Sequence, residues 1–273
     1  MNTDLNKFIS DHLNRINWVF FDLSHPGNLG ASARALKVMN ACNVKLVNPV
    51  RAGLAKENIA IRRAAGAKDV LESCSETTFE QATKKSKYVI AFSSRKREIQ
   101  PPEVEFNLMI ENVVELLISC QDSRVSMVFG GERVGLRNSD LIKCTHLCKF
   151  ATNPVYSSLN LSHAVQLVAH ALRSKLLSQF NTNSDVEPDI LKISNPNNLN
   201  FNKPGITQQK ILGLKKSFLE LSFDIGLIKF DKKGKIEDKI SRILNSSNLS
   251  ENDFKLLQSF FALIKKRIKE ITK

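Results

Sequence analysis

The chain has 273 residues, with 40 Lys and Arg against 27 Asp and Glu, so its formal net charge is +13. Hydrophobic residues make up 42% of the chain. This fraction is enough for a buried core, so the chain is not expected to be disordered over its whole length. No apolar run approaches the roughly 18–20 residues of a membrane helix, and the first residues have no signal-peptide core, so we expect no membrane partner. Five cysteines without disulfide-framework spacing indicate the reducing cytoplasm.

Short β-branched and aromatic runs predict five buried strands, and amphipathic stretches between them predict helices. The strands are expected at 16–23, 44–47, 88–92, 125–129 and 147–151. The helices are expected at 31–41, 103–119 and 159–177. Strands that alternate with helices are typical of an α/β fold with a parallel sheet covered on both faces.

The pattern changes after Phe180. Residues 181–202 are rich in Asn, Ser, Asp and Pro, which predicts a linker. Three Lys-rich amphipathic helices without strand signals are expected beyond it, at 207–227, 236–244 and 251–271. Ser250 and Asp253 form a partial capping box before the last helix. We therefore predict an α/β domain over residues 1–180 and a small all-α domain over residues 203–273.

The excess of positive charge is concentrated in the predicted helical domain. Residues 203–273 hold 16 Lys and Arg against 8 Asp and Glu, whereas residues 1–202 hold 24 against 19. Such a surplus favours binding to polyanions, nucleic acid first, although a role in solubility is the simpler alternative.

Several familiar sites can be set aside. The chain has no Walker P-loop, no G-x-G-x-x-G after the first strand and no H-E-x-x-H. Cys144, His146 and Cys148 are spaced as metal ligands but lack a fourth donor, and Cys148 is expected in the core, so we predict no metal. His25 is either a general base or, as we favour, a turn residue.

Two polar segments follow predicted strands. In the first, residues 28–34, Asn28 is expected to cap a helix and Gly30 to allow another backbone or a ligand to approach. The second, residues 129–136, lies at the carboxyl edge of the sheet, where ligands bind in open α/β folds. Glu132 would face that site, although a simple Gly-rich turn would also account for the segment.

A third polar segment, residues 153–167, opens a predicted helix. Ser157, Ser158 and Asn160 could cap that helix and leave its N-terminal amides for a carboxylate or phosphate. Capping alone explains one of these residues and not all three.

The three segments, in this order, resemble the motifs of the SPOUT superfamily of knotted RNA methyltransferases, specifically the TrmH-type 2′-O-ribose methyltransferases. The matching motifs are Asn28-x-Gly30-x-x-x-Arg34, Phe129-Gly130-x-Glu132-x-x-Gly135-Leu136, and Asn153-Pro154 with Ser157-Ser158-Leu159-Asn160-Leu161. Leu46-Val47-Asn48-Pro49 and the run from Ala64 to Val70 are similar to the group that methylates cytidine or uridine in the tRNA anticodon loop. Gly131 departs from that group, which usually has Arg there.

This resemblance implies an α/β domain with a parallel sheet and a C-terminal trefoil knot. It also implies S-adenosyl-L-methionine as cofactor and a homodimer whose active site lies at the subunit interface. The cofactor-binding residues implied are Phe92, Ser93, Ser94, Gly130, Phe150, Ser157, Ser158 and Leu159. The catalytic residues implied are Arg34, Asn28, Glu132, Ser158 and Asn160, with Arg34 reaching the site of the other subunit.

Arg34 would act on a ribose 2′-hydroxyl of tRNA, with position 32 implied, and DNA is excluded because it lacks that hydroxyl. A guanidinium is protonated at neutral pH, so Arg34 is either an unusual base or a phosphate clamp. The helical domain would supply RNA contacts through Lys215, Lys216, Lys265, Lys266 and Arg267, together with Lys210, Lys232, Lys233 and Lys269. The alternatives are methylation of ribosomal RNA or another tRNA position, and a non-enzymatic RNA-binding protein.

Overall fold

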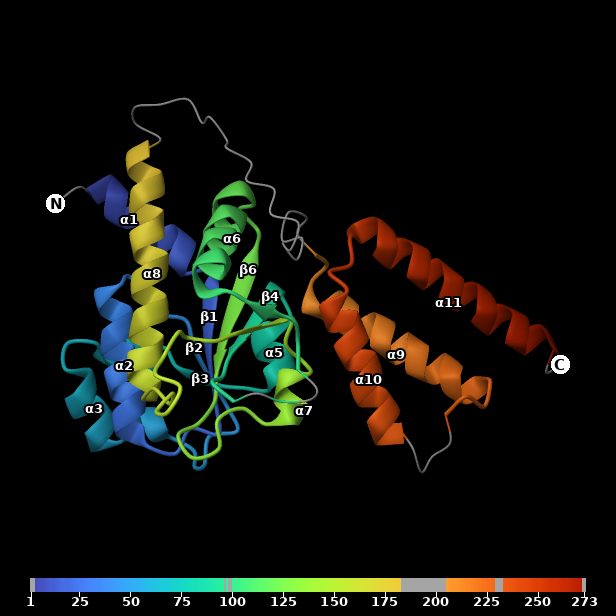
Figure 1. Ribbon diagram of the computed structural model, residues 1–273, viewed down its shortest axis with the longest axis horizontal. Coiled ribbons are helices and arrows are strands. Elements are labelled where there is room, and N and C mark those ends of the chain that lie inside the picture. Colours follow the sequence, from blue (N-terminus) through green and yellow to red (C-terminus); the bar gives the residue numbers. More distant parts are fainter. Residues whose placement is uncertain (1–2, 96, 98–99, 183–204, 229–232, 272–273) are drawn as a thin grey trace.

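The computed structural model describes residues 3–95, 97, 100–182, 205–228 and 233–271. Its centre is a seven-stranded sheet in the order β3-β2-β1-β6-β4-β7-β5, with every pairing parallel (Figure 1). The strands are β1 (Ile16–Phe21), β2 (Val44–Val47), β3 (Ser75–Glu76), β4 (Ser86–Phe92), β5 (Glu103–Val104), β6 (Arg124–Phe129) and β7 (His146–Cys148). The predicted α/β class and parallel sheet are confirmed.

All five predicted strands are present, and β3 and β5 are additional. Each of these two has only two residues, which is too short for a hydrophobic pattern to mark. All six residues of the central strand β1 are buried, as expected for a parallel strand covered on both faces. Trp18 and Phe20 enter the core on one face of the sheet, and Val19 and Phe21 enter the core on the other.

Helices cover both faces of the sheet. On the first face, α1 (Thr3–Leu13), α2 (Pro26–Val38), α6 (Phe106–Ser119) and α8 (Leu161–Thr182) contribute to one core. The short helices η1 (Leu54–Lys56), α3 (Asn58–Ala64) and α4 (Lys68–Glu72) pack beside α2. On the second face lie α5 (Phe79–Thr83) and α7 (Asn138–Leu141).

The expected start of α2 is wrong. The helix begins at Pro26, because proline fixes a helical φ at the first position and His25 is extended before it. His25 is the N-cap, and its Nδ1 accepts a hydrogen bond from Gly27 N at 3.1 Å. Asn28 therefore lies inside the first turn and does not cap the helix, and the preference for a turn role at His25 agrees with the structure.

Helix α8 is longer than predicted and includes Asn181 and Thr182, the first two residues of the expected linker. Residues 183–202 of that linker lie outside the described residues. Helix α6 begins at Phe106 and not at the expected Glu103, because Glu103 and Val104 form a strand that pairs with β7.

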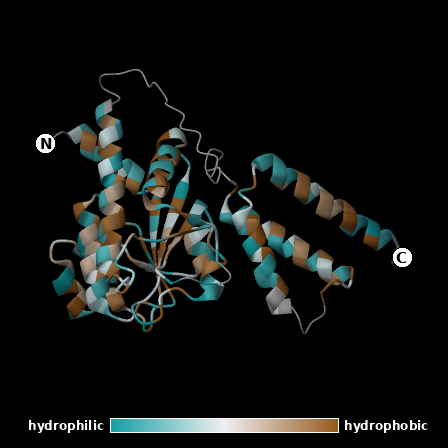
Figure 2. Cartoon of the chain, viewed as in Figure 1, coloured by the Kyte–Doolittle hydropathy of each residue, from teal (hydrophilic) through white to brown (hydrophobic). Residues whose placement is uncertain are grey.

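The C-terminal helices are α9 (Gln208–Asp224), α10 (Lys233–Ser246) and α11 (Glu251–Ile271). Their apolar side chains form a core of their own, with Ile211, Leu214 and Phe261 buried in it. Hydrophilic and hydrophobic residues alternate along these helices (Figure 2), and Leu256, Phe260 and Leu263 of α11 are exposed. The predicted capping box is confirmed, since Ser250 N donates to Asp253 Oδ2 and Asp253 N donates to Ser250 Oγ.

Two hydrogen bonds fasten these helices to the α/β part of the chain. Gln209 N donates to Lys84 O at 3.1 Å, and Asn245 Nδ2 donates to Ile142 O at 3.0 Å. Within the described ranges no helix combines the length and the apolar character needed to cross a bilayer. All five cysteines are free thiols.

Candidate active site

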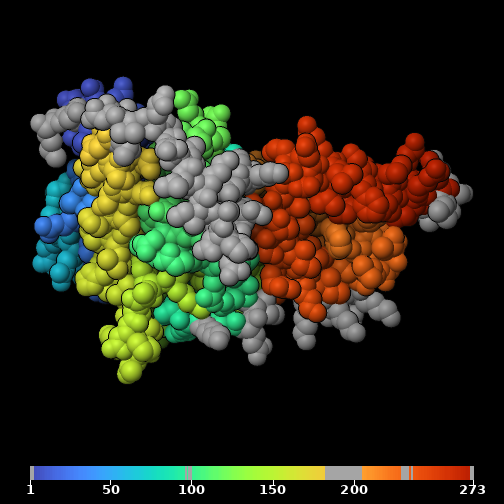
Figure 3. Space-filling model, turned by 45° about the horizontal axis from the view of Figure 1, so that its top comes forward, coloured from blue at the N-terminus to red at the C-terminus, as the bar shows by residue number. Residues whose placement is uncertain are grey.

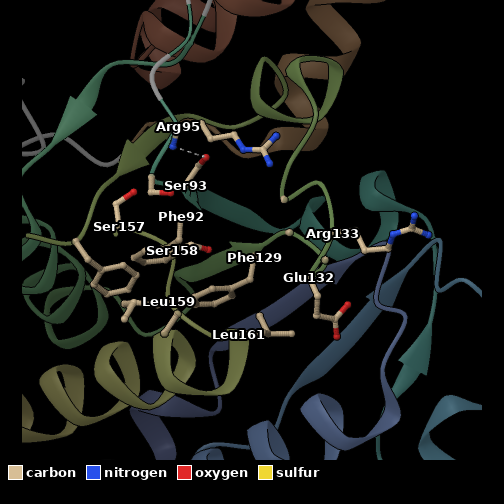
Figure 4. Close-up of a pocket in the computed structure, with 16 residues that line it drawn as sticks. Phe92, Ser93, Arg95, Phe129, Glu132, Arg133, Ser157, Ser158, Leu159 and Leu161 are labelled. Atoms are coloured by element: carbon tan, nitrogen blue, oxygen red, sulfur yellow. Dashed lines mark hydrogen bonds between the residues drawn. The ribbon is translucent and has the colours of Figure 1, made fainter. Parts of the chain in front are cut away.

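A pocket of about 790 Å³, open to solvent, lies at the carboxyl edge of the sheet (Figure 4). Its walls come from the segments that follow β4, β6 and β7 and from the start of α8. The lining residues are Phe92, Ser93, Ser94, Arg95, Phe129, Gly130, Gly131, Glu132, Arg133, Gly135, Phe150, Ser157, Ser158, Leu159, Leu161 and Ala164. All eight residues predicted to bind the cofactor are among them.

The floor of the pocket is aromatic. The rings of Phe92 and Phe129 stack with centroids 4.7 Å apart and planes 7° apart. Phe150 continues the row at 5.5 Å from Phe92. These side chains reach the pocket because each ends or directly follows a parallel strand. They give it a flat apolar surface, and the Ser93, Ser157 and Ser158 segments supply polar groups.

Two glycines make the loop after β6 compact. A Cβ at Gly130 would lie 2.1 Å from the carbonyl carbon of Gly135, and one at Gly131 would lie 2.4 Å from Asp22 O. The loop backbone therefore packs directly on itself and on the end of β1. Here an arginine at position 131 would require the backbone near Asp22 to move, which explains the departure from the usual motif in physical terms.

Glu132 connects the loop after β6 to the start of α2. Its carboxylate accepts hydrogen bonds from Ser24 Oγ at 2.8 Å, Asn28 Nδ2 at 2.8 Å, Ser24 N at 3.2 Å and His25 N at 3.3 Å. Burial alone would raise the pKa of Glu132, but the hydrogen bonds from Asn28 and Ser24 outweigh it and lower the pKa. The carboxylate is therefore ionised at neutral pH, beside the positive end of a helix.

Asn28 and Asn160 extend this network to the start of α8. Asn160 Nδ2 donates to Asn28 Oδ1 at 3.1 Å, and Asn160 Oδ1 accepts from Ser162 N at 2.9 Å. Asn28 must point its amide nitrogen toward the Glu132 carboxylate, which can only accept, so its amide oxygen faces Asn160. Asn160 must then point its amide nitrogen toward Asn28. Asn160 therefore caps α8, one of the capping roles predicted for this segment.

The structure thus brings together four of the five predicted catalytic residues. Glu132 and Ser158 line the pocket, and Asn28 and Asn160 lie beside it through the hydrogen bonds above. Arg34 is different: it is exposed on α2 and does not line this pocket. Its position within one chain does not complete the site.

The residues spaced as metal ligands do not converge. Cys144 is buried in the core on the second face of the sheet, and Cys148 is buried in the core on the first. Between them His146 is buried, which lowers its pKa to about 4. Across the described ranges, no three His, Cys, Asp or Glu side chains are close enough to share a metal ion.

Four of the nine cations predicted to bind RNA are paired with carboxylates of the C-terminal helices. Lys215 pairs with Glu237 at 2.9 Å, and Lys265 pairs with Glu220 at 2.8 Å. Two further ion pairs are Lys210 with Glu251 and Arg267 with Glu270.

The other predicted cations differ. Lys216, Lys266 and Lys269 are exposed, and within the part of the chain that is described they make no ion pair. Lys232 and the side chain of Lys233 lie outside the described residues.

Sequence reasoning missed three contributors to the site. Ser24 and His25 hold the Glu132 carboxylate, and Phe129 forms part of the floor. The signal was present, because all three lie at the carboxyl end of a predicted strand. Which of them would meet Glu132 depends on the distance between β1 and β6, which no local pattern gives.

Comparison with known proteins gives a consistent result. The model of the SpoU rRNA methylase family matches residues 15–170. A tRNA (cytidine/uridine-2′-O-)-methyltransferase TrmJ of Yersinia pestis (strain Pestoides F) is 36% identical over 178 residues, covering 65% of this chain and 67% of that protein. The TrmJ of Shigella dysenteriae serotype 1 is 30% identical over 258 residues, covering 94% and 98%.

Among solved structures, TrmJ from Z. mobilis ZM4 superposes with a TM-score of 0.72 at 20% identity, covering 91% of this chain and 98% of that one. This likeness supports the fold, including the presence of helices after the α/β part.

Proposed function

The chain belongs to the SpoU rRNA methylase family, and on that premise we propose that it transfers a methyl group from S-adenosyl-L-methionine to a ribose 2′-oxygen of cytidine or uridine in tRNA. The observation that carries this is the pocket: loops from three parallel strands and the start of α8 meet there, and they contain residues of the second and third family motifs. Asn28 of the first motif joins them through its hydrogen bonds to Glu132 and Asn160. The relatives that span most of the chain are named for this tRNA reaction.

The pocket suits the proposed cofactor in its chemistry. Its stacked phenylalanines offer a flat apolar surface to an adenine ring, and the Ser93, Ser157 and Ser158 segments offer polar groups to a ribose. Glu132 holds a negative charge at the pocket, where it would attract a cationic sulfonium group. When bound, the cofactor supplies an activated methyl group.

The chain's own residues would fix the geometry. Glu132, Asn28 and Asn160 tie the starts of α2 and α8 to the loop after β6, so two walls of the pocket are held in place through the adjoining start of α2. Alignment of two reactants can contribute about 7–11 kcal/mol to a reaction of this kind. We assign these three residues to positioning, and Arg34 to the target nucleotide as a phosphate clamp or a base.

A homodimer would bring Arg34 of one subunit to the pocket of the other. Arg34 is exposed and outside its own pocket, and the apolar side chains of Val38 on α2 and Leu167 on α8 are also exposed. Segment 153–158 protrudes near the pocket (Figure 3), with Val155 91% and Tyr156 79% exposed. Apolar patches of this kind on a soluble chain favour self-association.

A mixed dimer tests this arrangement. One subunit would carry Arg34→Ala and the other Gly130→Val, which blocks the pocket. If Arg34 acts on the partner's pocket, random mixing restores about a quarter of the wild-type activity. No recovery in dimers of verified composition would show that Arg34 acts within its own subunit.

We also propose the family's trefoil knot and a separate RNA-binding role for α9–α11. Support for the knot comes from β7, which lies between β4 and β5 although it follows both in the chain. The separate hydrophobic core of α9–α11 supports a domain. A cytoplasmic location agrees with the free thiols and a tRNA substrate.

The direct test is methyl transfer from labelled cofactor to an unmodified tRNA transcript, followed by nuclease digestion and mass spectrometry. We expect 2′-O-methylated cytidine or uridine at position 32. A 2′-deoxynucleotide at position 32 should abolish the transfer. Methylation that persists on this transcript would move the target to another position, and transfer only to ribosomal RNA would overturn the tRNA assignment.

A further inference from the structure

The α/β part of the chain has its own concentration of positive charge. Residues 51–68 contain five Lys and Arg and one Asp or Glu, a net of +4. Residues 1–202 have a net of only +5, so this short segment, which includes α3, holds most of it. Arg62 and Arg63 on α3 are exposed. The proposed function uses neither of them.

Three contacts show that α3 runs alongside α2 in the same direction. A Cβ at Gly27 would lie 3.3 Å from Ile59 Cγ2, and one at Gly30 would lie 2.1 Å from Ala60 O. Further along, Lys37 Nζ donates to Gly66 O at 3.0 Å. Figure 1 shows the two helices side by side.

Arg34 lies on the face of α2 that meets α3. Gly27, Gly30, Arg34 and Lys37 are spaced by three or four residues, so they share one face of the helix. Arg34 falls between the Gly30 and Lys37 contacts and is therefore beside the C-terminal end of α3. Arg63 stands there, one turn after Ile59, the residue that meets Gly27.

The carboxylates near these arginines already have partners. Asp69 pairs with Lys37 at 2.7 Å, and Glu57 pairs with Arg51 at 2.7 Å. Within the described ranges, Arg34, Arg62 and Arg63 make no ion pair with any carboxylate. Neighbouring guanidiniums without an acid repel each other, and an anion that binds both removes that repulsion.

We infer that Arg63 and Arg34 together bind a backbone phosphate of the substrate RNA, with Arg62 contributing to the same cationic edge. This inference rests on the proposed function, because it places the phosphate beside the nucleotide on which Arg34 acts. A guanidinium binds phosphate through two parallel hydrogen bonds, and a phosphodiester is the anion that every RNA carries. Arg63 is thus a positioning residue for the substrate.

The test compares Arg63→Ala with wild type in the full-length protein, using an unmodified tRNA transcript. The slope of log affinity against log salt should fall by about 0.7–0.9, the value for one lost phosphate contact. The KM for tRNA should rise several-fold with a smaller change in kcat, and cofactor affinity measured by calorimetry should stay the same. Arg63→Lys should keep most of the salt slope.

Arg51→Ala is the matched control. It removes one positive charge from the same segment, but Arg51 already has Glu57 as its partner, so the salt slope should stay near the wild-type value. Equal losses in both variants would reduce the effect to net charge and overturn the site.

Two other outcomes would also overturn the inference. One is an Arg63→Ala variant that binds tRNA as wild type does. The other is a variant whose tRNA affinity is unchanged but whose mass in solution falls, which would show that α3 contacts a second protein chain. If wild type itself fails to methylate any tRNA, the proposed function fails, and that result is separate from the binding comparison.

Discussion

The α2–α3 edge and the C-terminal helices are both basic, but their charges differ in availability. In the C-terminal helices Lys210, Lys215, Lys265 and Arg267 are neutralised by carboxylates of the same helices. At the α2–α3 edge the local acids are taken by Lys37 and Arg51, which leaves three arginines unpaired. Lys216, Lys266 and Lys269 of the C-terminal helices likewise make no ion pair within the described ranges, so ion pairs cancel part of the positive charge on both surfaces and leave a few free cations on each.

The largest effect is expected at Arg34. Arg34→Ala should lower methyl transfer by at least about 100-fold, because either a clamp or a base for the target nucleotide is lost. Cofactor binding should stay intact, since Arg34 does not line the pocket of its own chain. Single-turnover kinetics measure the rate of methyl transfer, and calorimetry measures the affinity for the cofactor. Retention of most of the turnover would remove Arg34 from the site.

The next largest effect is expected from a change in the spacing between α2 and α3. A methyl group at Gly30 would lie 2.1 Å from Ala60 O, so Gly30→Ala should force the helices apart and cost about 1–3 kcal/mol of stability. Thermal unfolding measures this cost.

Gly213→Ala in α9 is the control, because nothing lies within 4 Å of its Cβ position, and it should stabilise the helix by about 0.5–1 kcal/mol. If Gly30→Ala did not lower the stability either, α2 and α3 would not be packed as closely as the structure shows, and the inference that Arg34 lies beside Arg63 would lose its support.

The anchor of α2 at the pocket should have a smaller, pH-dependent effect. Glu132 has a lowered pKa in the folded state, so its ionised form adds stability above the ordinary value of 4.5, and this is lost as the pH falls through the folded-state pKa. Glu132→Gln should therefore lower the Tm at pH 7 by an amount equivalent to about 1 kcal/mol or less.

The Tm difference between wild type and Glu132→Gln should shrink as the pH falls below 4.5 and through the lowered pKa of Glu132. A constant difference across the pH range would show that the carboxylate charge has no role in holding α2.

The smallest effect should come from the unpaired lysines of α11. Lys266→Ala with Lys269→Ala should weaken tRNA binding a few-fold and reduce the salt slope by about 1–2. The paired cations Lys265 and Arg267, changed together to Ala, should alter the slope less. Filter binding at several salt concentrations distinguishes the pairs. Equal salt slopes for the two double variants would show that paired and unpaired cations contribute alike to tRNA binding.

Local sequence patterns predicted five of the seven strands and two of the pocket segments, residues 129–136 and 153–167, whereas Phe92, Ser93, Ser94 and Phe150 were implied only by the family resemblance. The strands are buried on both faces, so they appear as continuous apolar runs, and a ligand loop in this fold class follows directly after such a run. The patterns missed α1, the short helices α3, α4, α5 and α7, the two-residue strands and the cap hydrogen bond of His25. Those depend on a chain end that packs against α8, on pairing partners and on a single cap hydrogen bond.

The sequence by itself determined the α/β class and the motifs that carry the family resemblance, because each is a short-range pattern, and that resemblance implied the residues of the pocket. Only the tertiary structure decided which charges are unpaired. It placed the Glu132 carboxylate between the starts of two helices and left Arg34 outside its own pocket. It also packed α3 against α2, with Gly30 close to Ala60 and Lys37 bonded to Gly66. The physical reason is that an ion pair or a hydrogen bond depends on distances between residues far apart in the chain, and those distances are set when the helices pack.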